Sequence, residues 1–255
     1  MSNRRKFLQQ AAFASAPFIL PSHVWAAKGD TSPNNRINVA IIGPGKMGRG
    51  HAHKLIRNPR AQITGFAEIA EIRTMHTKDL IEKHYSRNTP SDTWKGLTIT
   101  KNYLELLEDK SLDAVLIATP DHWHGEPTIR AARAKKHVYC EKPISLTIKE
   151  GRAMAEAVKE NQVVFQTGSQ QRTEYGGKFR RTVEMVRSGA IGELKKVRVC
   201  VGGPPVPCDL PTEPVPEGIG WDAWLGPAPV RGYNKILCPD DVHNHFPAWR
   251  RYREY

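Results

Sequence analysis

A glycine-rich turn between an apolar strand and a helix constrains the fold of this chain more than any other feature. The residues that match G-x-G-x-x-G are Gly43-Pro44-Gly45-Lys46-Met47-Gly48, directly after the strand-like run 37–42. In such a turn Gly43 permits the tight reversal, Gly45 lets the backbone approach a pyrophosphate, and Gly48 allows the helix to pack closely on the strand. Lys46 and Met47 open the helix, whose first amides and positive dipole end bind phosphate. The turn therefore predicts a dinucleotide site at the end of the first strand.

Strand-like apolar runs alternate with segments of helical periodicity over residues 36–165. The predicted strands are 37–42, 61–67, 97–100, 112–118, 137–140 and 163–167, and the predicted helices are 46–57, 70–85, 102–108, 124–135 and 147–160. This alternation is typical of an α/β fold, a doubly wound parallel sheet of the Rossmann type. Thr147, three residues before Glu150, predicts a capping box at the last of these helices.

An acidic residue ends the second predicted strand. Glu68 stands 25 positions after Gly43. A carboxylate here accepts hydrogen bonds from the adenosine ribose hydroxyls and repels a 2′-phosphate, which favours NAD over NADP. The alternative interpretation is a glutamate that complements the dipole of the next helix. Because Arg73 could reach a 2′-phosphate, NADP stays the second choice of cofactor.

Two further motifs follow strands, at the edge where open α/β sheets bind ligands. The run of residues 118–124 follows the fourth strand, and Glu141-Lys142-Pro143 follows the fifth. Together with the glycine turn, these motifs resemble those of the GFO/IDH/MocA oxidoreductases, the glucose-fructose oxidoreductase and inositol dehydrogenase family. The resemblance covers about residues 36–202, and the Glu-Lys-Pro motif is its most specific element.

The resemblance implies roles for single residues. Lys142 would hydrogen-bond the hydroxyl that loses hydride and assist transfer of its proton. The residues that the resemblance places around the nicotinamide end of the cofactor are Thr119, Pro120, His124, Glu141, Lys142 and Pro143. The alternatives are that Lys142 is a surface lysine in a turn and that His124 caps a helix.

On the substrate side the resemblance is weaker. Gln171 and Arg172 would face cofactor and substrate, and Trp221 lies in a loop that resembles one in secreted sugar-oxidising members; its ring would stack on a sugar or anchor the loop. Family members carry the acid–base histidine, with an acidic residue four positions before it, on a segment beyond the last residue of this chain. Asp241 and His245 have that spacing within a loop, which we interpret as coincidence. No metal site is expected there.

The second part of the chain, residues 166–255, is expected to begin an α+β substrate domain that is incomplete in this chain. Its pattern predicts a helix over 174–188, a strand over 194–201 without partner strands, and an ordered Pro- and Trp-rich loop from residue 203. The four cysteines, Cys140, Cys200, Cys208 and Cys238, form no C-x-x-C pair. Cys140 is expected to be a free buried thiol, whereas a disulfide among the other three is left open.

The first 27 residues are typical of a signal segment, with residues 28–35 as a polar linker. Arg4 and Arg5 precede an apolar stretch over residues 7–20 and a small-residue cleavage site near Ala26. The adjacent arginines resemble the twin-arginine signal, which exports folded proteins to the periplasm. The alternative is a frayed basic terminus.

These features favour an NAD-dependent oxidoreductase that removes hydride from a carbinol of a sugar, polyol or glycoside. Two alternatives are open: a catalytically incomplete dinucleotide-binding fragment, and an NAD-dependent enzyme that cleaves or epimerises glycosides. The formal charge is +12, but the basic residues are spread along the chain and no base-reading module accompanies them, so nucleic acid is not the expected partner. No apolar run reaches the roughly 18 residues of a membrane span. The sequence leaves the specific sugar and a homo-oligomeric state open.

Overall fold

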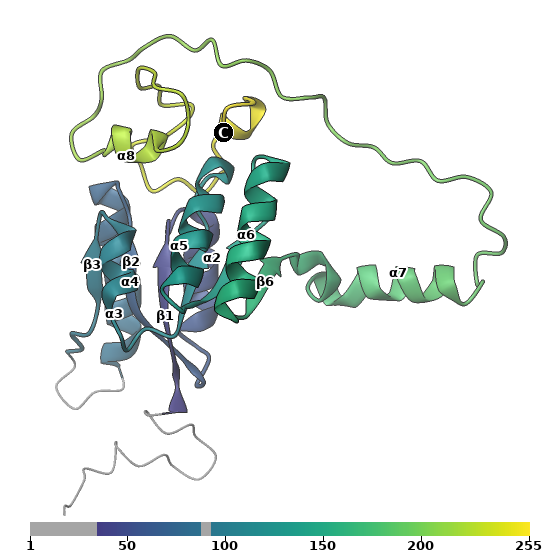
Figure 1. Ribbon diagram of the computed structural model, residues 1–255, viewed down its shortest axis with the longest axis horizontal. Helices are drawn as coiled ribbons and strands as arrows, with labels where there is room; N and C mark the ends of the chain where they lie inside the picture. The colour runs from purple at the N-terminus through teal and green to yellow at the C-terminus, as the bar shows by residue number, and fades with distance from the viewer. Residues whose placement is uncertain (1–34, 88–92) are drawn as a thin grey trace, which may run out of the picture. The chain divides into compact units, whose positions relative to one another are not determined.

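The computed structural model describes residues 35–87 and 93–255 (Figure 1). The predicted signal segment and almost all of the predicted linker lie outside the described residues. The strands are β1 (Ile37–Ile42), β2 (Ala61–Ala67), β3 (Thr98–Thr100), β4 (Ala114–Ile117), β5 (His137–Glu141) and β6 (Phe165–Gly168). The main helices are α2 (Lys46–Leu55), α3 (Glu71–Ser86), α4 (Tyr103–Glu108), α5 (Gly125–Arg133), α6 (Ile148–Asn161), α7 (Lys178–Arg187) and α8 (Trp221–Leu225).

The six strands form one parallel sheet in the order β3-β2-β1-β4-β5-β6. The chain therefore winds outward from β1 in one direction and from β4 in the other, and the predicted doubly wound Rossmann fold is confirmed. Consecutive side chains of a strand point to opposite faces, so β1 contributes to two separate cores. Val39 and Ile41 pack in the core that also contains residues of α2 and α3, whereas Ala40 and Ile42 pack with residues of α4 and α5.

Local sequence signals set the ends of several elements. The Thr147 side chain accepts from the Glu150 amide while the Glu150 carboxylate accepts from the Thr147 amide, so the predicted capping box is present. The predicted helix over 174–188 is shortened to α7, because Gly176 and Gly177 have positive φ values of 67° and 71° and interrupt it at its start. Glycine adopts this left-handed region without steric penalty.

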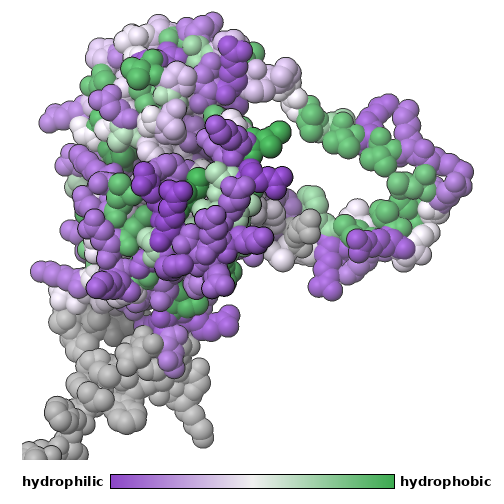
Figure 2. Space-filling model, viewed as in Figure 1, coloured by the Kyte–Doolittle hydropathy of each residue, from purple (hydrophilic) through white to green (hydrophobic). Residues whose placement is uncertain are grey.

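The predicted strand over 194–201 is wrong: these residues form no strand. Their alternation of apolar and polar side chains is real, but Val197, Val199 and Val201 are 66%, 76% and 84% exposed. A strand needs a neighbour to accept its backbone hydrogen bonds, and this segment runs extended without one. Figure 2 shows hydrophobic residues, in green, standing out along it.

Residues 206–255 fold into an irregular segment around an aromatic cluster (Figure 1, yellow-green). Trp221 stacks on Trp224 with ring centroids 4.9 Å apart and 12° between the planes, and Tyr233 meets Trp221 edge-on. The cluster also buries Trp249 and Tyr255. Hydrogen bonds join this segment to the sheet domain, since the Glu71 amide donates to Gly218 O and the Gly220 amide to Ile69 O.

All four cysteines are free, and Cys140 is buried on β5 as expected. Burial raises the pKa of its thiol to about 12, so the group stays protonated at neutral pH. Among residues 35–87 and 93–255, no helix is both long and apolar enough to cross a membrane.

Candidate functional site

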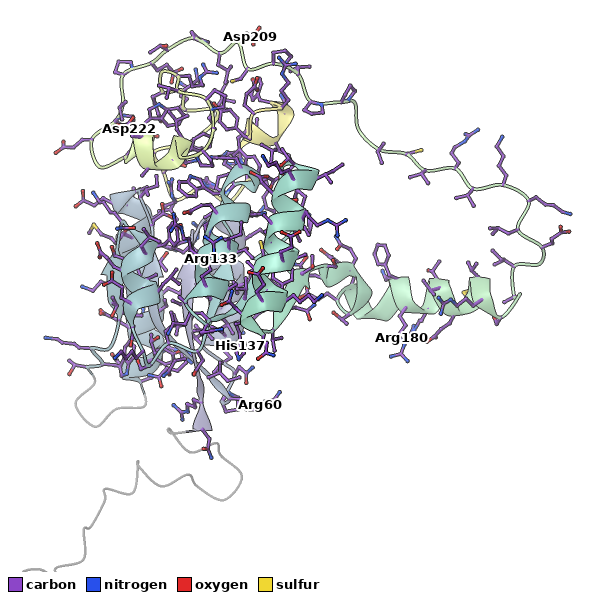
Figure 3. The ribbon with its side chains drawn as sticks, in the orientation of Figure 1. Arg60, Arg133, His137, Arg180, Asp209 and Asp222 are labelled. Carbon is purple, nitrogen blue, oxygen red and sulfur yellow. The ribbon has the colours of Figure 1, made fainter. Side chains whose placement is uncertain are left out.

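A cavity of about 590 Å³ lies at the carboxyl end of the sheet. It lies at the ends of the neighbouring strands β1 and β4, where the order of the strands reverses. Ligands bind at this point in open α/β folds. Turns after β1, β2, β3, β4 and β5 line it from one side, and residues between 223 and 250 line it from the other. Arg60 and His137 mark the opposite, amino end of the strands, whereas Asp222 lies near the cavity end (Figure 3).

The glycine turn has the conformation that its spacing predicts. Gly43 has φ 78°, and a Cβ there would lie 2.8 Å from Thr119 Cγ2; a Cβ on Gly48 would lie 2.6 Å from Gly43 O. By contrast, a Cβ on Gly45 would meet no atom within 4 Å. Gly45 is also the N-cap of α2 and has no side chain to satisfy the first-turn amides. Lys46 and Met47 line the same cavity, which therefore contains an open cradle of helix amides suited to a pyrophosphate.

Glu68 lies in the cavity wall at the end of β2. It is buried, and its Oε1 accepts from the Ile69 and Ala70 amides at 3.0 Å each. Arg73 Nη2 lies 3.2 Å from the same oxygen, and Arg73 Nη1 donates to Pro239 O at 2.7 Å. The carboxylate thus accepts from two amides directly before α3 and still borders the cavity. Arg73 is bound to Glu68 and to the C-terminal segment.

The Glu141-Lys142-Pro143 turn borders the cavity from β5. Glu141 and Lys142 line it, and Lys142 is exposed. The Lys142 amide donates to Glu141 Oε2 at 3.3 Å. Burial alone raises the pKa of Glu141, but the hydrogen bond and charge of His51, with weaker hydrogen bonds from Lys142 and Gln170, outweigh it and lower the pKa. A carboxylate therefore lies beside the exposed lysine.

His124 joins two of the predicted motifs. Its Nδ1 lies 2.5 Å from Pro143 O and its Nε2 lies 2.9 Å from Thr119 O, while the residue is only 1% exposed. The imidazole thus bridges the turn after β4 to the turn after β5. Thr119, Pro120 and His124 all line the cavity. The structure therefore brings every predicted cofactor residue except Gly48 and Pro143 into the cavity wall, and these two lie in its glycine turn and Glu-Lys-Pro turn.

Two of the predicted substrate residues lie outside the cavity wall. Neither Gln171 nor Trp221 is in the cavity wall, and the side chain of Arg172 is not among those described. Trp221 is 6% exposed, stacks on Trp224 and donates from Nε1 to Arg231 O at 2.8 Å. Its packing is that of a loop anchor, one of the two interpretations that the sequence leaves open. Gln170, one residue before Gln171, donates to Glu141.

Several residues of the cavity wall were not predicted from the sequence. Lys101, Asn102 and Tyr103 follow β3, and the rule that ligands bind at carboxyl ends of strands would have identified them. Phe246 and Arg250 come from the irregular C-terminal segment, for which no local pattern predicts a position. Lys46 Nζ lies 4.2 Å from the centre of the Phe246 ring, a cation–π contact across the cavity.

Three arginine contacts hold the C-terminal segment over the cavity. Arg250 donates to both carboxylate oxygens of Asp121, at 3.0 and 2.8 Å, and Asp121 is 4% exposed. Arg49 Nη2 donates to His243 O at 2.6 Å, and Arg73 makes the contact to Pro239. Burial and the nearby charge of Arg73 lower the pKa of the Arg49 guanidinium. The cavity therefore depends on both parts of the chain.

His122 packs between the cavity wall and the aromatic cluster. Its Nε2 lies 2.8 Å from Trp224 O, and its buried Nδ1 has no hydrogen-bond partner among the residues that the structure describes. Burial lowers its pKa to about 4. His243 and His245 contact each other through Nδ1 and a backbone oxygen at 2.9 Å. Within the described ranges, no group of three or more His, Cys, Asp or Glu side chains is arranged to hold a metal ion.

Residues 37–169, more than half of the chain, match the family described as "Oxidoreductase family, NAD-binding Rossmann fold". The chain belongs to the GFO/IDH/MocA oxidoreductase family. Within the GFO/IDH/MocA proteins, the myo-inositol 2-dehydrogenase of Thermotoga maritima is 32% identical over 176 residues, 68% of this chain and 48% of that protein.

The chain also resembles a solved structure and a second relative. The crystal structure of myo-inositol 2-dehydrogenase from Lactobacillus plantarum superposes with a TM-score of 0.52 at 27% identity, covering 62% of this chain and 43% of that one. A glycosyl hydrolase family 109 protein of Stenotrophomonas maltophilia is 26% identical over 243 residues, 87% of this chain and 49% of that protein. This GFO/IDH/MocA chain thus spans about half the length of the relatives that it matches.

Proposed function

We propose that this chain is the dinucleotide-binding part of an oxidoreductase that uses NAD to remove hydride from a carbinol of a sugar, polyol or glycoside. The observation that carries the proposal is the single cavity in which the glycine turn, Glu68 and Lys142 meet. The inositol dehydrogenases among its relatives support a polyhydroxylated substrate. A small carbohydrate, rather than a macromolecule, is the proposed partner.

The residues of the cavity fit a nicotinamide dinucleotide. The open cradle at Gly45 and the uncapped first turn of α2 would hold the pyrophosphate. The Glu68 carboxylate would accept the adenosine ribose hydroxyls and disfavour a 2′-phosphate. Arg73 is tied to Glu68 and Pro239, which supports NAD as the cofactor over NADP. When bound, the nicotinamide ring supplies the hydride acceptor.

Lys142 is assigned the proton chemistry. Its side chain is exposed in the cavity wall, on a turn held by His124 from one side and Glu141 from the other. Its Nζ would hydrogen-bond the hydroxyl of the carbinol and take part in moving the hydroxyl proton as the carbonyl forms. A positioned general acid–base group contributes about 10² to 10⁴ in rate.

A second candidate is cleavage or epimerisation of a glycoside by transient oxidation. The alignment with the glycosyl hydrolase family 109 protein favours it, because that match extends over 87% of this chain, beyond the Rossmann domain. The two candidates differ in net redox change. A dehydrogenase accumulates NADH with its substrate, whereas the second reaction consumes glycoside without net NADH.

The test uses the native protein recovered from its source cells. Trp123, Trp224 and Trp249 line the cavity, so binding of NADH should quench their fluorescence. We expect tighter binding of NADH than of NADPH, a carbohydrate-dependent rise in NADH absorbance, and loss of turnover in Lys142→Ala with NADH binding retained. An active preparation in which Lys142→Ala turns over like wild type contradicts the assignment of Lys142. Dinucleotide binding without turnover on any sugar, polyol or glycoside supports the non-catalytic alternative.

We also propose export to the periplasm through the twin-arginine route. The supporting features are Arg4 and Arg5, the apolar stretch over residues 7–20 and the cleavage site near Ala26. The intact mass of the native protein and its recovery from periplasmic extract test this. Retention of the first residues in a cytoplasmic protein contradicts it.

A further inference from the structure

A buried hydrogen-bond network joins α2 to the turn that carries Lys142. His51 Nε2 lies 2.6 Å from Glu141 Oε1, and the two side chains are 11% and 6% exposed. Gln170 Nε2 donates to the same carboxylate oxygen and to the Tyr139 hydroxyl, 3.1 Å away. The His51 ring also meets the Tyr139 ring edge-on, with centroids 5.2 Å apart.

The network separates two hollows of the molecule. Glu141 lines the large cavity, whereas His51, Tyr139 and Gln170 line a groove of about 500 Å³ formed by different residues. His51 therefore contacts Glu141 on the side of the groove, opposite the cavity in which we place the dinucleotide. His51 does not line the large cavity, so a role for it at the cofactor must act through Glu141.

The ionisation of Glu141 determines which atom of the His51–Glu141 contact carries the proton. The pKa of Glu141 is lowered, because the hydrogen bond and charge of His51, together with hydrogen bonds from Lys142 and Gln170, outweigh the effect of burial. An ionised carboxylate only accepts hydrogen bonds, so His51 Nε2 must be the donor. The second carboxylate oxygen accepts the Lys142 amide, which ties the orientation of the carboxylate to the backbone of the next residue.

We propose that His51 is a positioning residue: through Glu141 it holds the Glu141-Lys142-Pro143 turn in place at the edge of the cavity. The turn is then fixed from two sides, by His51 at Glu141 and by His124 at Pro143. The proposal rests on the proposed function of Lys142. Displacement of a catalytic group by about 1 Å costs on the order of 10²-fold in rate.

The other titratable groups around the pair lie on three elements. Tyr139 is on β5, and burial, with the charge of Glu141, raises its pKa. Lys54 is one turn further along α2 and pairs with Glu174, which follows β6. Lys142 adjoins Glu141 in the chain. The interaction that changes directly when His51 is replaced is the hydrogen bond to Glu141, so the carboxyl of Glu141 is the group whose titration should move.

Two polar substitutions separate the hydrogen bond from packing. In His51→Gln the side-chain amide nitrogen is as far along the side chain as Nε2 and can still donate to Glu141. In His51→Asn the amide nitrogen matches Nδ1 instead and falls short. His53→Ala is the matched control, because His53 is on the same helix and exposed. All variants are made in the native protein and checked for melting temperature.

The first readout is NADH affinity against pH, followed by tryptophan quenching. We expect the acid limb of this profile to move to higher pH in His51→Asn, because Glu141 loses the donor that lowers its pKa, and to stay near wild type in His51→Gln and His53→Ala. The second readout is turnover: kcat should fall roughly 10- to 100-fold in His51→Asn, with a small change in KM and substantial recovery in His51→Gln.

Either of two results would overturn the proposal. One is a wild-type pH profile and kcat in His51→Asn. The other is equal loss in His51→Gln and His51→Asn without the pH shift, which indicates a purely structural role. Failure of the proposed function is seen separately, as wild-type protein that shows no hydride transfer; the pH profile of NADH binding still tests the link between His51 and Glu141 in that protein.

Discussion

Gly45 offers a sharp test of the dinucleotide site, because substitution there changes the cradle without disturbing the fold. A Cβ at Gly45 would meet no atom within 4 Å, and the backbone φ of −65° is one that alanine adopts. Gly45→Ala should therefore fold, with a small loss of melting temperature because alanine is a poorer N-cap than glycine. The added methyl group would occupy the space in which a pyrophosphate approaches the first turn of α2.

The expected loss can be worked from the hydrogen bonds at stake. A hydrogen bond to a charged group contributes roughly 1.5 to 3 kcal/mol. Since about 1.4 kcal/mol corresponds to a tenfold change in a binding constant, losing one amide–phosphate hydrogen bond should raise the Kd for NADH roughly 10- to 150-fold. Larger loss is expected if the methyl group displaces the phosphate from more than one amide.

The assay is titration with NADH, read by quenching of the cavity tryptophans. Gly50→Ala is the matched control: Gly50 is exposed on the same helix, and a Cβ there also meets no atom within 4 Å. That change should leave the Kd unchanged and stabilise the protein by about 0.5 to 1 kcal/mol, since alanine is the better helix former. A wild-type Kd in Gly45→Ala would refute the assignment of the cradle.

Three further predictions concern stability. Arg250→Ala removes both hydrogen bonds to the buried Asp121 carboxylate and should destabilise the fold by about 1.5 kcal/mol. This value is at the low end for hydrogen bonds to charged groups because Arg250 is half-exposed. Urea denaturation measures the change, and an unchanged midpoint contradicts the prediction. Burial lowers the pKa of His122 to about 4 from 6.5, so the unfolded state binds more protons than the folded state between these two values. The free energy of unfolding should therefore fall by roughly 3 kcal/mol as the pH drops through that window. Melting temperature measured against pH should decline less in His122→Asn than in wild type, and parallel curves would refute the assignment. Thr147→Ala removes the capping-box acceptor for the Glu150 amide and should cost about 1 kcal/mol, measured as the change in unfolding free energy.

The Rossmann half of this chain can be predicted from its amino-acid sequence, because the signals there are local. All six strands and five helices occur within three residues of their predicted ends. The close approach of Gly48 to Gly43 lies within one βα unit, and the Thr147 cap spans a single helical turn. The apolar alternation of residues 194–201 was just as clear, yet it produced no strand, because pairing requires a neighbour that a local pattern does not supply.

The way in which distant residues combine at the cavity depends on how the chain folds. His51 and Glu141 are 90 positions apart, and Arg250 and Asp121 are 129 apart. The family resemblance implies that Gln171 faces cofactor and substrate, and in the structure its neighbour Gln170 contacts Glu141. Irregular segments have no periodicity from which their path can be predicted. The position of residues 223–250 in the cavity wall depends on the packing of the aromatic cluster, which no local pattern predicts. Local hydrogen bonds and steric limits depend on residues that are close in the sequence. Burial and ion pairing depend instead on which distant residues the folded chain brings into contact.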